Sequence, residues 1–148
     1  MTQASTPLNN LTVANGEKLV WGRRTYVMGI INVTPDSFSG DGLGGDIQAI
    51  VDLALRFEEE GADIMDGGAE STRPGHEPIT TGQEVKRLLP ALEAVSSALQ
   101  LPISVDTYKA PVAREALRAG ATIVNDIWGL KADPHLAKIA AETGAGMV

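Results

Sequence analysis

The sequence predicts an α/β protein built around a parallel β-sheet. Short apolar runs alternate with longer stretches whose apolar residues recur at helical spacing, at roughly 20–40 residues per unit. The 16 glycines and the 4% aromatic content are typical of a chain with many strand-to-helix turns, and they disfavour a β-sandwich. The alternation fits a (β/α)8 barrel or an open doubly wound sheet. Because a complete barrel takes about 250 residues, the units in these 148 residues amount to about half of one.

The expected elements begin with a hairpin. Residues 1–10 are polar and are expected to be a flexible amino-terminus. In residues 11–20, two short apolar pieces flank Asn15-Gly16, a common hairpin turn. The strands and helices that follow are expected at strand 26–33, helix 47–57, strand 62–65, helix 83–99, strand 102–105, helix 110–118, strand 121–124, helix 133–142 and the start of a strand at 144–148.

Capping and helix-breaking residues support these boundaries. Asp46 is suited to cap the first helix, and Gly61 is suited to end it. Gly120 and Gly144 separate later helices from the strands that follow them in the same way. Pro90 falls inside the second helix, where it predicts a kink.

Charge and composition exclude several classes of protein. A net charge of −7 leaves no basic surplus for nucleic acid, although a few local cations and backbone N–H groups can hold a small anion. The absence of cysteine excludes disulfides and thiolate metal sites. Because the sequence shows neither a signal-peptide pattern nor a membrane-spanning apolar run, we expect a soluble, cytoplasmic protein.

Polar side chains follow each of the first four predicted strands. In both parallel architectures the carboxyl ends of the strands carry function. One interpretation is that these residues only cap the helices that follow, but four such ends in succession favour a shared site at one rim. The residues are Asn32 and Asp36, then Asp66, then Asp106, and then Asn125 with Asp126.

These residue types suit a charged, flat substrate. An amide oxygen such as that of Asn32 is a hard ligand for Mg²⁺, which also binds substrate phosphates. Thr72 and Arg73 lie in a loop suited to a diphosphate, because the arginine fork matches phosphate oxygens. Asp106 and Asn125 suit a heterocycle with neighbouring hydrogen-bond donors and acceptors.

Four sequence blocks resemble the dihydropteroate synthases. The first is Gly29-Ile30-Ile31-Asn32-Val33-Thr34-Pro35-Asp36-Ser37-Phe38-Ser39, and the second runs from Asp66 to Glu70-Ser71-Thr72-Arg73-Pro74-Gly75. The others are Ser104-Val105-Asp106-Thr107 and Val124-Asn125-Asp126-Ile127. The blocks occur in the family's order and spacing. The resemblance covers about residues 11–148, which implies one partial pterin-binding barrel domain of the TIM type.

The resemblance also implies roles for individual residues. Asp106 and Asn125 would bind the pterin ring and take part in catalysis, with Ile127 lining the pocket. Asn32 would coordinate Mg²⁺ together with the diphosphate. Phe38 stands in a polar loop and suits either an aromatic substrate or an anchor for that loop. Arg73, in the loop after the second predicted strand, would be catalytic. The substrates or sulfonamide inhibitors would contact residues of the loops after the first and second strands, namely Asp36, Phe38, Ser71, Thr72, Arg73 and Pro74.

The reaction implied is the condensation of 6-hydroxymethyl-7,8-dihydropterin diphosphate with p-aminobenzoate, which gives 7,8-dihydropteroate and diphosphate in folate biosynthesis. It needs a stabilised leaving group rather than a nucleophilic side chain. The sequence fits this, because it has no Ser-His-Asp or Cys-His arrangement. Both histidines, His76 and His135, are expected at the surface.

The sequence departs from the family pattern at several places. Ser39-Gly40-Asp41-Gly42 has an altered order, Gly67 replaces an aliphatic residue and Ala69 replaces a glycine. The later Asp-Pro-Gly, Ser-Arg-Lys and Arg-x-His segments of the family are not in the sequence. A half barrel leaves strand edges open, so we expect a chain ending at Val148 to be inactive and soluble only with a partner. The full-length form is expected to be a homodimer.

Two other functions fit the same residues. A non-catalytic fragment that binds pterin or assembles with a barrel partner would explain the missing segments. A pterin-dependent methyltransferase would share the Asp and Asn pterin contacts, but it would not need the Pro-Asp-Ser-Phe-Ser or Ser-Thr-Arg-Pro-Gly loops.

Overall fold

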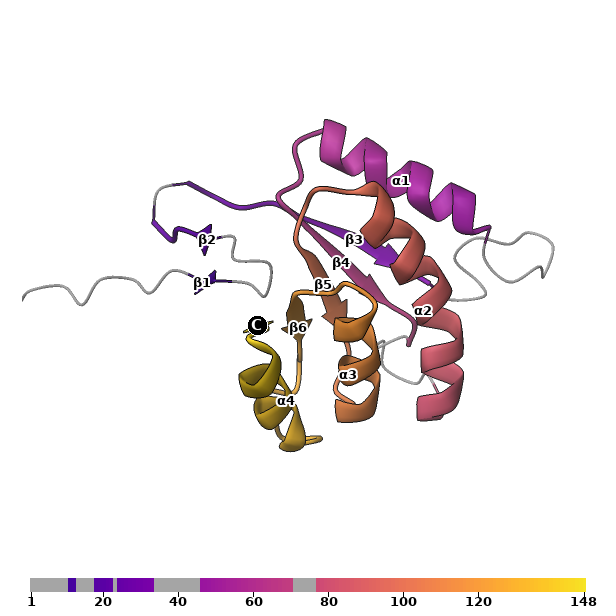
Figure 1. Ribbon diagram of the computed structural model, residues 1–148, viewed down its shortest axis with the longest axis vertical. Coiled ribbons are helices and arrows are strands. Elements are labelled where there is room, and N and C mark those ends of the chain that lie inside the picture. Colours follow the sequence, from indigo (N-terminus) through magenta and orange to yellow (C-terminus); the bar gives the residue numbers. More distant parts are fainter. Residues whose placement is uncertain (1–10, 13–17, 23, 34–45, 71–76) are drawn as a thin grey trace, which may run out of the picture.

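A parallel sheet with helices along one face forms the body of the protein (Figure 1). The computed structural model describes residues 11–12, 18–22, 24–33, 46–70 and 77–148. The five-stranded sheet has the order β3-β4-β5-β6-β7, and every neighbouring pair is parallel. The alternation predicted from the sequence is therefore confirmed. The elements are β1 Leu11–Thr12, β2 Lys18–Leu19, β3 Met28–Asn32, α1 Ile47–Glu59, β4 Ile64–Gly68, α2 Thr81–Ala98, β5 Ile103–Asp106, α3 Ala110–Arg118, β6 Ile123–Asn125, α4 His135–Thr143 and β7 Gly146–Met147.

The helix boundaries follow from caps in the sequence. The carboxylate of Asp46 accepts hydrogen bonds from the backbone N–H groups of Gln48 and Ala49, as predicted for the start of α1. Thr80 and Gln83 form a reciprocal capping box at the start of α2. Helix α2 continues through Pro90 as one element.

The second strand differs from its prediction. It was expected over residues 62–65, but β4 runs from Ile64 to Gly68. Its residues pair in register with β3, from Met28 opposite Ile64 to Asn32 opposite Gly68. Asp and Gly have low strand propensity, so the sequence pattern placed a loop where pairing with β3 extends the strand.

The main core lies between the sheet and the helices. Alternate strand residues point toward the helices, because successive side chains of a strand lie on opposite faces. They pack against buried apolar residues of all four helices. The strand residues are Ile31, Met65, Ile103, Val105, Val124 and Met147, and the helix residues include Ile50, Ala54, Leu88, Leu92, Val112, Ala116 and Leu136.

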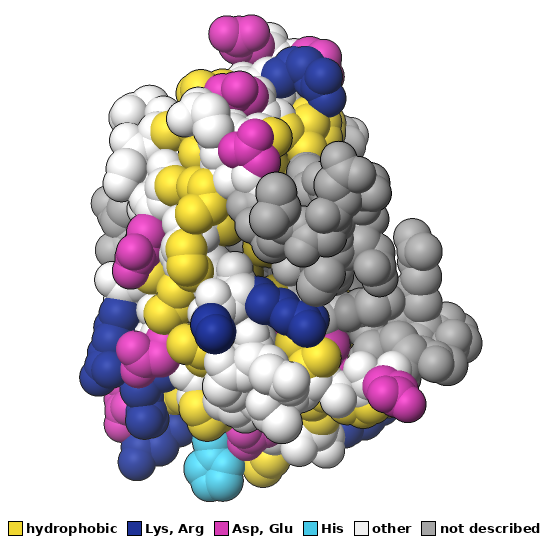
Figure 2. All heavy atoms as spheres, turned by 90° about the vertical axis from the view of Figure 1, so that its right-hand side faces the viewer, with side chains coloured by type: hydrophobic (Ala, Val, Ile, Leu, Met, Phe, Trp, Pro, Cys, Tyr) yellow, Lys and Arg dark blue, Asp and Glu magenta, His cyan; other side chains and the backbone are white. Residues whose placement is uncertain are grey.

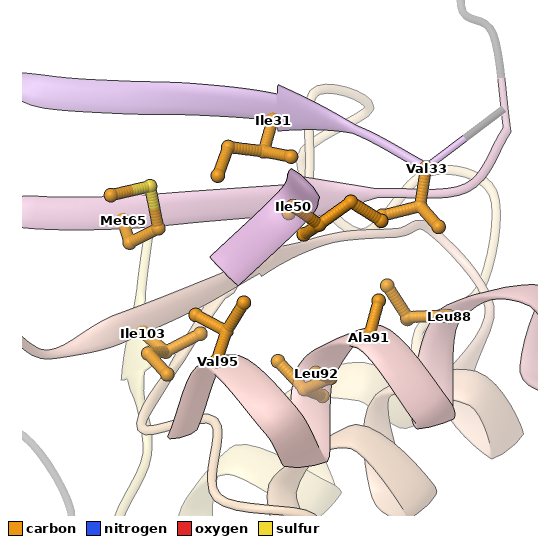
Figure 3. Close-up of a pocket in the computed structure, with 10 residues that line it drawn as sticks. Ile31, Val33, Ile50, Met65, Leu88, Ala91, Leu92, Val95 and Ile103 are labelled. Carbon is orange, nitrogen blue, oxygen red and sulfur yellow. The ribbon is translucent and has the colours of Figure 1, made fainter. Parts of the chain in front are cut away.

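A small hollow remains inside this core (Figure 3). Gly67 of β4 lines it, and a Cβ atom at this position would meet no other atom within 4 Å. The missing side chain at Gly67 is thus one reason for the hollow. The other lining residues are Ile31, Val33, Ile50, Met65, Leu88, Ala91, Leu92, Val95 and Ile103.

The hairpin covers one end of the sheet face that points away from the helices. At the amino-terminal ends of the strands, Leu19 of the β1–β2 hairpin packs with Ile64 and Ile123, and Leu11, Tyr26 and Met28 pack around them. The hairpin strands are antiparallel, as predicted; the turn between them lies outside the described residues. The carboxyl ends of the strands lie at the opposite end of this face.

Both outer edges of the sheet are open within the described residues. Strands β3 and β7 each pair with one neighbour. Ile30 on β3 is 61% exposed and Val148 after β7 is 60% exposed. These are the open edges expected of a half barrel.

The described surface carries charges of both signs. On the face shown in Figure 2, Lys and Arg side chains are interspersed with Asp and Glu side chains. None of the described helices is long and apolar enough to cross a membrane.

Candidate active site

Three of the predicted site residues lie on one face of the sheet, at the carboxyl ends of their strands. Asn32 pairs with Gly68, and Asp106 pairs with Asn125. A Cβ atom built on Gly68 would lie 3.2 Å from the Cβ of Asp106. The row across the sheet is therefore Asn32, Gly68, Asp106 and Asn125. Since Gly68 has no side chain, Asp106 has room at the centre of this row.

A second polar layer lies directly beneath the row. Asp66 and Ser104 pair across β4 and β5, and their exposed fractions are 3% and 0%. The Nδ2 atom of Asn125 donates a hydrogen bond to Oδ2 of Asp66 at 3.4 Å. The other oxygen of Asp66, Oδ1, and the Ser104 hydroxyl form no hydrogen bond of good geometry, although the Ser104 hydroxyl is near enough to lower the pKa of Asp66. The floor of the site thus offers buried polar atoms that are incompletely paired.

Burial controls the charge of the central carboxyl group. The pKa of Asp106 is raised to about 6, first by desolvation and then by the negative charges of Asp66, Glu84, Asp126 and Glu70. Desolvation also raises the pKa of Asp66, against the opposing effects of the nearby Ser104 hydroxyl and of the hydrogen bond from Asn125. A ligand that donates N–H groups to Asp106 would favour its ionised form.

A buried ion-pair cluster supports the site from the side. The ammonium group of Lys109 contacts Glu70, lies 2.7 Å from Oε2 of Glu84 and donates a 2.7 Å hydrogen bond to the carbonyl oxygen of Ile79. Glu84 also accepts a 2.7 Å hydrogen bond from the Thr107 hydroxyl. The cluster joins three parts of the chain: Glu70 shortly after β4, Ile79 and Glu84 before and within α2, and Thr107 and Lys109 after β5.

Lys109 keeps its charge despite partial burial. Desolvation works against the ammonium of Lys109, but hydrogen bonds with Glu70 and Glu84 outweigh it and raise the pKa of Lys109. Glu70 precedes residues 71–76 and Ile79 follows them in the sequence, and the side chain of Lys109 contacts both.

Asp126 has a structural role. Its carboxylate accepts hydrogen bonds from the backbone N–H groups of Trp128 at 3.0 Å and Leu130 at 2.6 Å. This stabilises a turn in which Leu130 has a φ of 67°, a left-handed conformation that is unfavourable for a leucine. Ile127, predicted to line the pterin pocket, is exposed on this turn next to the exposed Trp128.

The remaining predicted residues lie outside the described part of the chain. They are Asp36, Phe38, Ser71, Thr72, Arg73 and Pro74, together with His76. His135 is described, and its side chain is exposed, as predicted.

The pterin binding enzyme family matches residues 28–148. The chain belongs to this family. It is 49% identical over 121 residues to a dihydropteroate synthase of Clostridium beijerinckii, which covers 82% of this chain and 45% of the relative. Its structure is similar to the Xanthomonas albilineans dihydropteroate synthase with 4-aminobenzoic acid, with a TM-score of 0.83 and 40% identity over 93% of this chain and 50% of that one. The Yersinia pestis enzyme, in a complex with a sulfonamide drug, gives a TM-score of 0.80 at 40% identity over 94% of this chain and 50% of that one.

These similarities identify the fold of this member of the pterin binding enzyme family. It is a partial TIM barrel of the dihydropteroate synthase type and spans about the amino-terminal half of such enzymes. The predicted half barrel is therefore confirmed. The row of Asn32, Asp106 and Asn125 lies at the catalytic face of a barrel, where the carboxyl ends of the strands meet.

The described residues supply few metal ligands. No three Asp, Glu, His or Cys side chains among them gather into a metal-binding group. Asn32 lies at the end of β3 with an exposed amide, so it could donate one hard oxygen to Mg²⁺.

The sequence placed Asp66 at the predicted rim without giving it a role of its own, and it did not single out Glu84 or Lys109. The sequence pattern placed Asp66 at the start of a loop, whereas it lies within β4 on the sheet face that points away from the helices. Lys109 and Glu84 lie 25 positions apart, and no local pattern joins them. One signal was available, namely a lysine three residues after Asp106 at a strand-to-helix turn.

Proposed function

We propose that this chain is the pterin-binding half of a dihydropteroate synthase. In the complete reaction, the diphosphate leaves the methylene carbon of the dihydropterin and the amine nitrogen of p-aminobenzoate bonds to that carbon. The products are 7,8-dihydropteroate, diphosphate and the proton lost by the amine. The observation that supports this most is the row of Asn32, Asp106 and Asn125 on three strands of one sheet face.

The pterin ring would lie over the centre of this row. Asp106 is a half-buried acceptor and Asn125 can both donate and accept, which suits a ring edge with N–H groups and ring nitrogens. An ionised Asp106 would also stabilise positive charge that develops on the pterin as the diphosphate leaves. The exposed Ile127 would cover an edge of the ring.

The diphosphate would lie toward β3. Asn32 would contribute one oxygen to Mg²⁺, and the bound ion would neutralise charge on the leaving diphosphate. Thr72 and Arg73 would contact the same group. Phe38, Ser71 and Pro74 would contribute to the site for p-aminobenzoate and sulfonamides, which occur with the Xanthomonas and Yersinia relatives, and Asp36 would contact the substrates.

Turnover would need more than these residues. The chain spans about half the length of its relatives, and β3 and β7 are edge strands of the sheet within the described residues. We expect the 148-residue chain to bind the pterin diphosphate weakly and to form no dihydropteroate by itself. The homodimer of the complete enzyme and its cytoplasmic location stay predictions.

Calorimetry tests the proposal. The pterin diphosphate should bind the wild-type chain more tightly with Mg²⁺ than without it. Asp106→Ala should weaken binding by about 10-fold or more, because it removes a charged hydrogen-bond acceptor. Asp52→Asn, at an exposed carboxylate on α1, is the matched control and should leave the affinity for the pterin diphosphate unchanged.

Three results would point elsewhere. Dihydropteroate formed by the chain alone would contradict the expected inactivity. A folded chain that binds no pterin diphosphate would contradict the proposed function. Preferential binding of methyl-tetrahydrofolate would support the methyltransferase instead.

A further inference from the structure

The buried carboxylate of Asp66 reaches across the sheet to the amide of Asn125. Asp66 is on β4 and Asn125 is on β6, so β5 lies between them. The inward-facing residue of β5 at the level of Asp66 is Ser104. Because this side chain is small, Oδ2 of Asp66 can accept the 3.4 Å hydrogen bond from Nδ2 of Asn125.

Stability does not explain why a carboxylate lies there. Asp66 is 3% exposed, and its Oδ1 is among the buried polar atoms without a hydrogen bond of good geometry. Burial raises its pKa, which means that the folded state disfavours the charged form. A buried charge without full pairing lowers stability relative to an apolar side chain of similar size. Buried ionisable groups of this kind are concentrated at functional sites.

An asparagine amide can occupy two orientations that differ by exchange of its oxygen and nitrogen. An ionised carboxylate accepts hydrogen bonds but has no proton to donate. Next to Asp66, the amide of Asn125 therefore keeps its nitrogen toward the floor. Its oxygen and its second N–H then face away from Asp66, where a ligand can use them.

We propose that Asp66 is a positioning residue, which holds the side-chain amide of Asn125 in the orientation that binds the ligand. This inference rests on the proposed function, because that function makes Asn125 a pterin contact. Asp66 itself would act through Asn125 and through the shape of the floor, without touching the substrate.

Two substitutions separate positioning from a structural role. Asp66→Leu keeps the number and branching of the side-chain heavy atoms in a larger, apolar side chain and removes the acceptor, whereas Asp66→Asn keeps an oxygen that can still accept from Asn125. We expect the affinity for the pterin diphosphate to fall by about 10-fold in Asp66→Leu and by less in Asp66→Asn. Thermal unfolding of both variants at pH 7 should occur at the wild-type temperature or above it. A structural role would instead lower stability and affinity together.

Ser104→Ala is the matched control in the same buried layer. It removes a hydroxyl beside Asp66 but leaves the partner of Asn125 in place. Its affinity should stay within about 2-fold of the wild type.

Nuclear magnetic resonance provides a reading that needs no ligand. The side-chain amide protons of Asn125 should shift and exchange faster with water in Asp66→Leu, and they should respond less in Ser104→Ala. Unchanged Asn125 resonances in a folded Asp66→Leu, or pterin affinity equal to that of the wild type, would overturn the proposal. If the wild-type chain binds no pterin, the proposed function fails, and the Asn125 resonances still decide whether Asp66 orients the amide.

Discussion

The ammonium nitrogen of Lys109 lies 2.7 Å from Oε2 of Glu84, and Glu84 is 1% exposed. The same ammonium contacts Glu70, so two buried carboxylates share one cation. Removing the cation would leave the carboxylate of Glu84 buried without the positive charge that now lies beside it. Lys109→Met is therefore expected to lower the free energy of unfolding by about 3–5 kcal/mol, measured by urea denaturation.

Arg118→Met is the matched control for this prediction. Arg118 pairs with Glu115 at 2.7 Å, but its side chain is 69% exposed. An exposed pair contributes about 0–1 kcal/mol, so this variant should differ little from the wild type. Equal losses in the two variants would show that the Lys109 cluster is not a buried network.

The raised pKa of Asp106 predicts how stability depends on pH. The pKa is about 6 in the folded chain, against about 3.9 for an unfolded aspartate. The folded state therefore binds the proton more tightly, so this carboxyl group lowers stability as pH rises from about 4 to about 6. Asp106→Asn should be more stable than the wild type at pH 7, and the difference should shrink toward pH 4.

Unfolding free energies of both proteins at pH 4, 5, 6 and 7 would check this. Asp52→Asn, at the exposed surface, should have the same unfolding free energy as the wild type at every pH. A wild-type chain that is more stable than Asp106→Asn at pH 7 would contradict the raised pKa.

The hollow in the core predicts a stabilising substitution (Figure 3). A methyl group at Gly67 would meet no atom within 4 Å and would extend into the hollow. Gly67→Ala should raise the free energy of unfolding by about 0.4–1 kcal/mol, because alanine also has less conformational freedom in the unfolded chain.

Gly68→Ala, one residue further along β4, is the contrasting variant. Its methyl carbon would lie 3.2 Å from the Cβ of Asp106, a tight contact in the middle of the candidate site. It should lower stability or displace Asp106, and pterin binding should weaken. Thermal unfolding temperatures of Gly67→Ala and Gly68→Ala distinguish the two effects. A lower unfolding temperature for Gly67→Ala than for the wild type would show that other side chains already fill the hollow.

The open edges of the sheet predict self-association. Ile30 lies on the inner face of β3 and is 61% exposed. Exposed apolar residues on an edge strand favour contact with another chain. In sedimentation velocity, the wild-type chain should form concentration-dependent oligomers, and Ile30→Lys should reduce them. Monomers of both proteins at high concentration would contradict this.

The sequence predicted the parts of the fold that depend on local pattern. The alternation of strands and helices follows from hydrophobic periodicity, and the start of α1 follows from Asp46. The rim of Asn32, Asp106 and Asn125 could be predicted because the carboxyl ends of parallel strands meet at one edge.

The missing predictions depend on contacts between distant residues. The extension of β4 to Gly68 follows from pairing with β3, against the propensity of its own residues. Asp66 and Asn125 are 59 positions apart, and Lys109 and Glu70 are 39 apart. Such pairs appear when the fold brings the strand ends together. The residues of the two predicted loops, including Phe38 and Arg73, lie outside the described chain and stay predictions.

Residue-resolved titration of the pterin diphosphate by nuclear magnetic resonance tests the candidate site most directly. If the ligand binds the rim, the resonances of Asn32, Asp106 and Asn125 should shift together and with one dissociation constant. The resonances of residues on the helices behind the sheet, such as Arg118 of α3, should not shift. Shifts confined to the helices, or independent responses of the three strand ends, would contradict a shared pterin site.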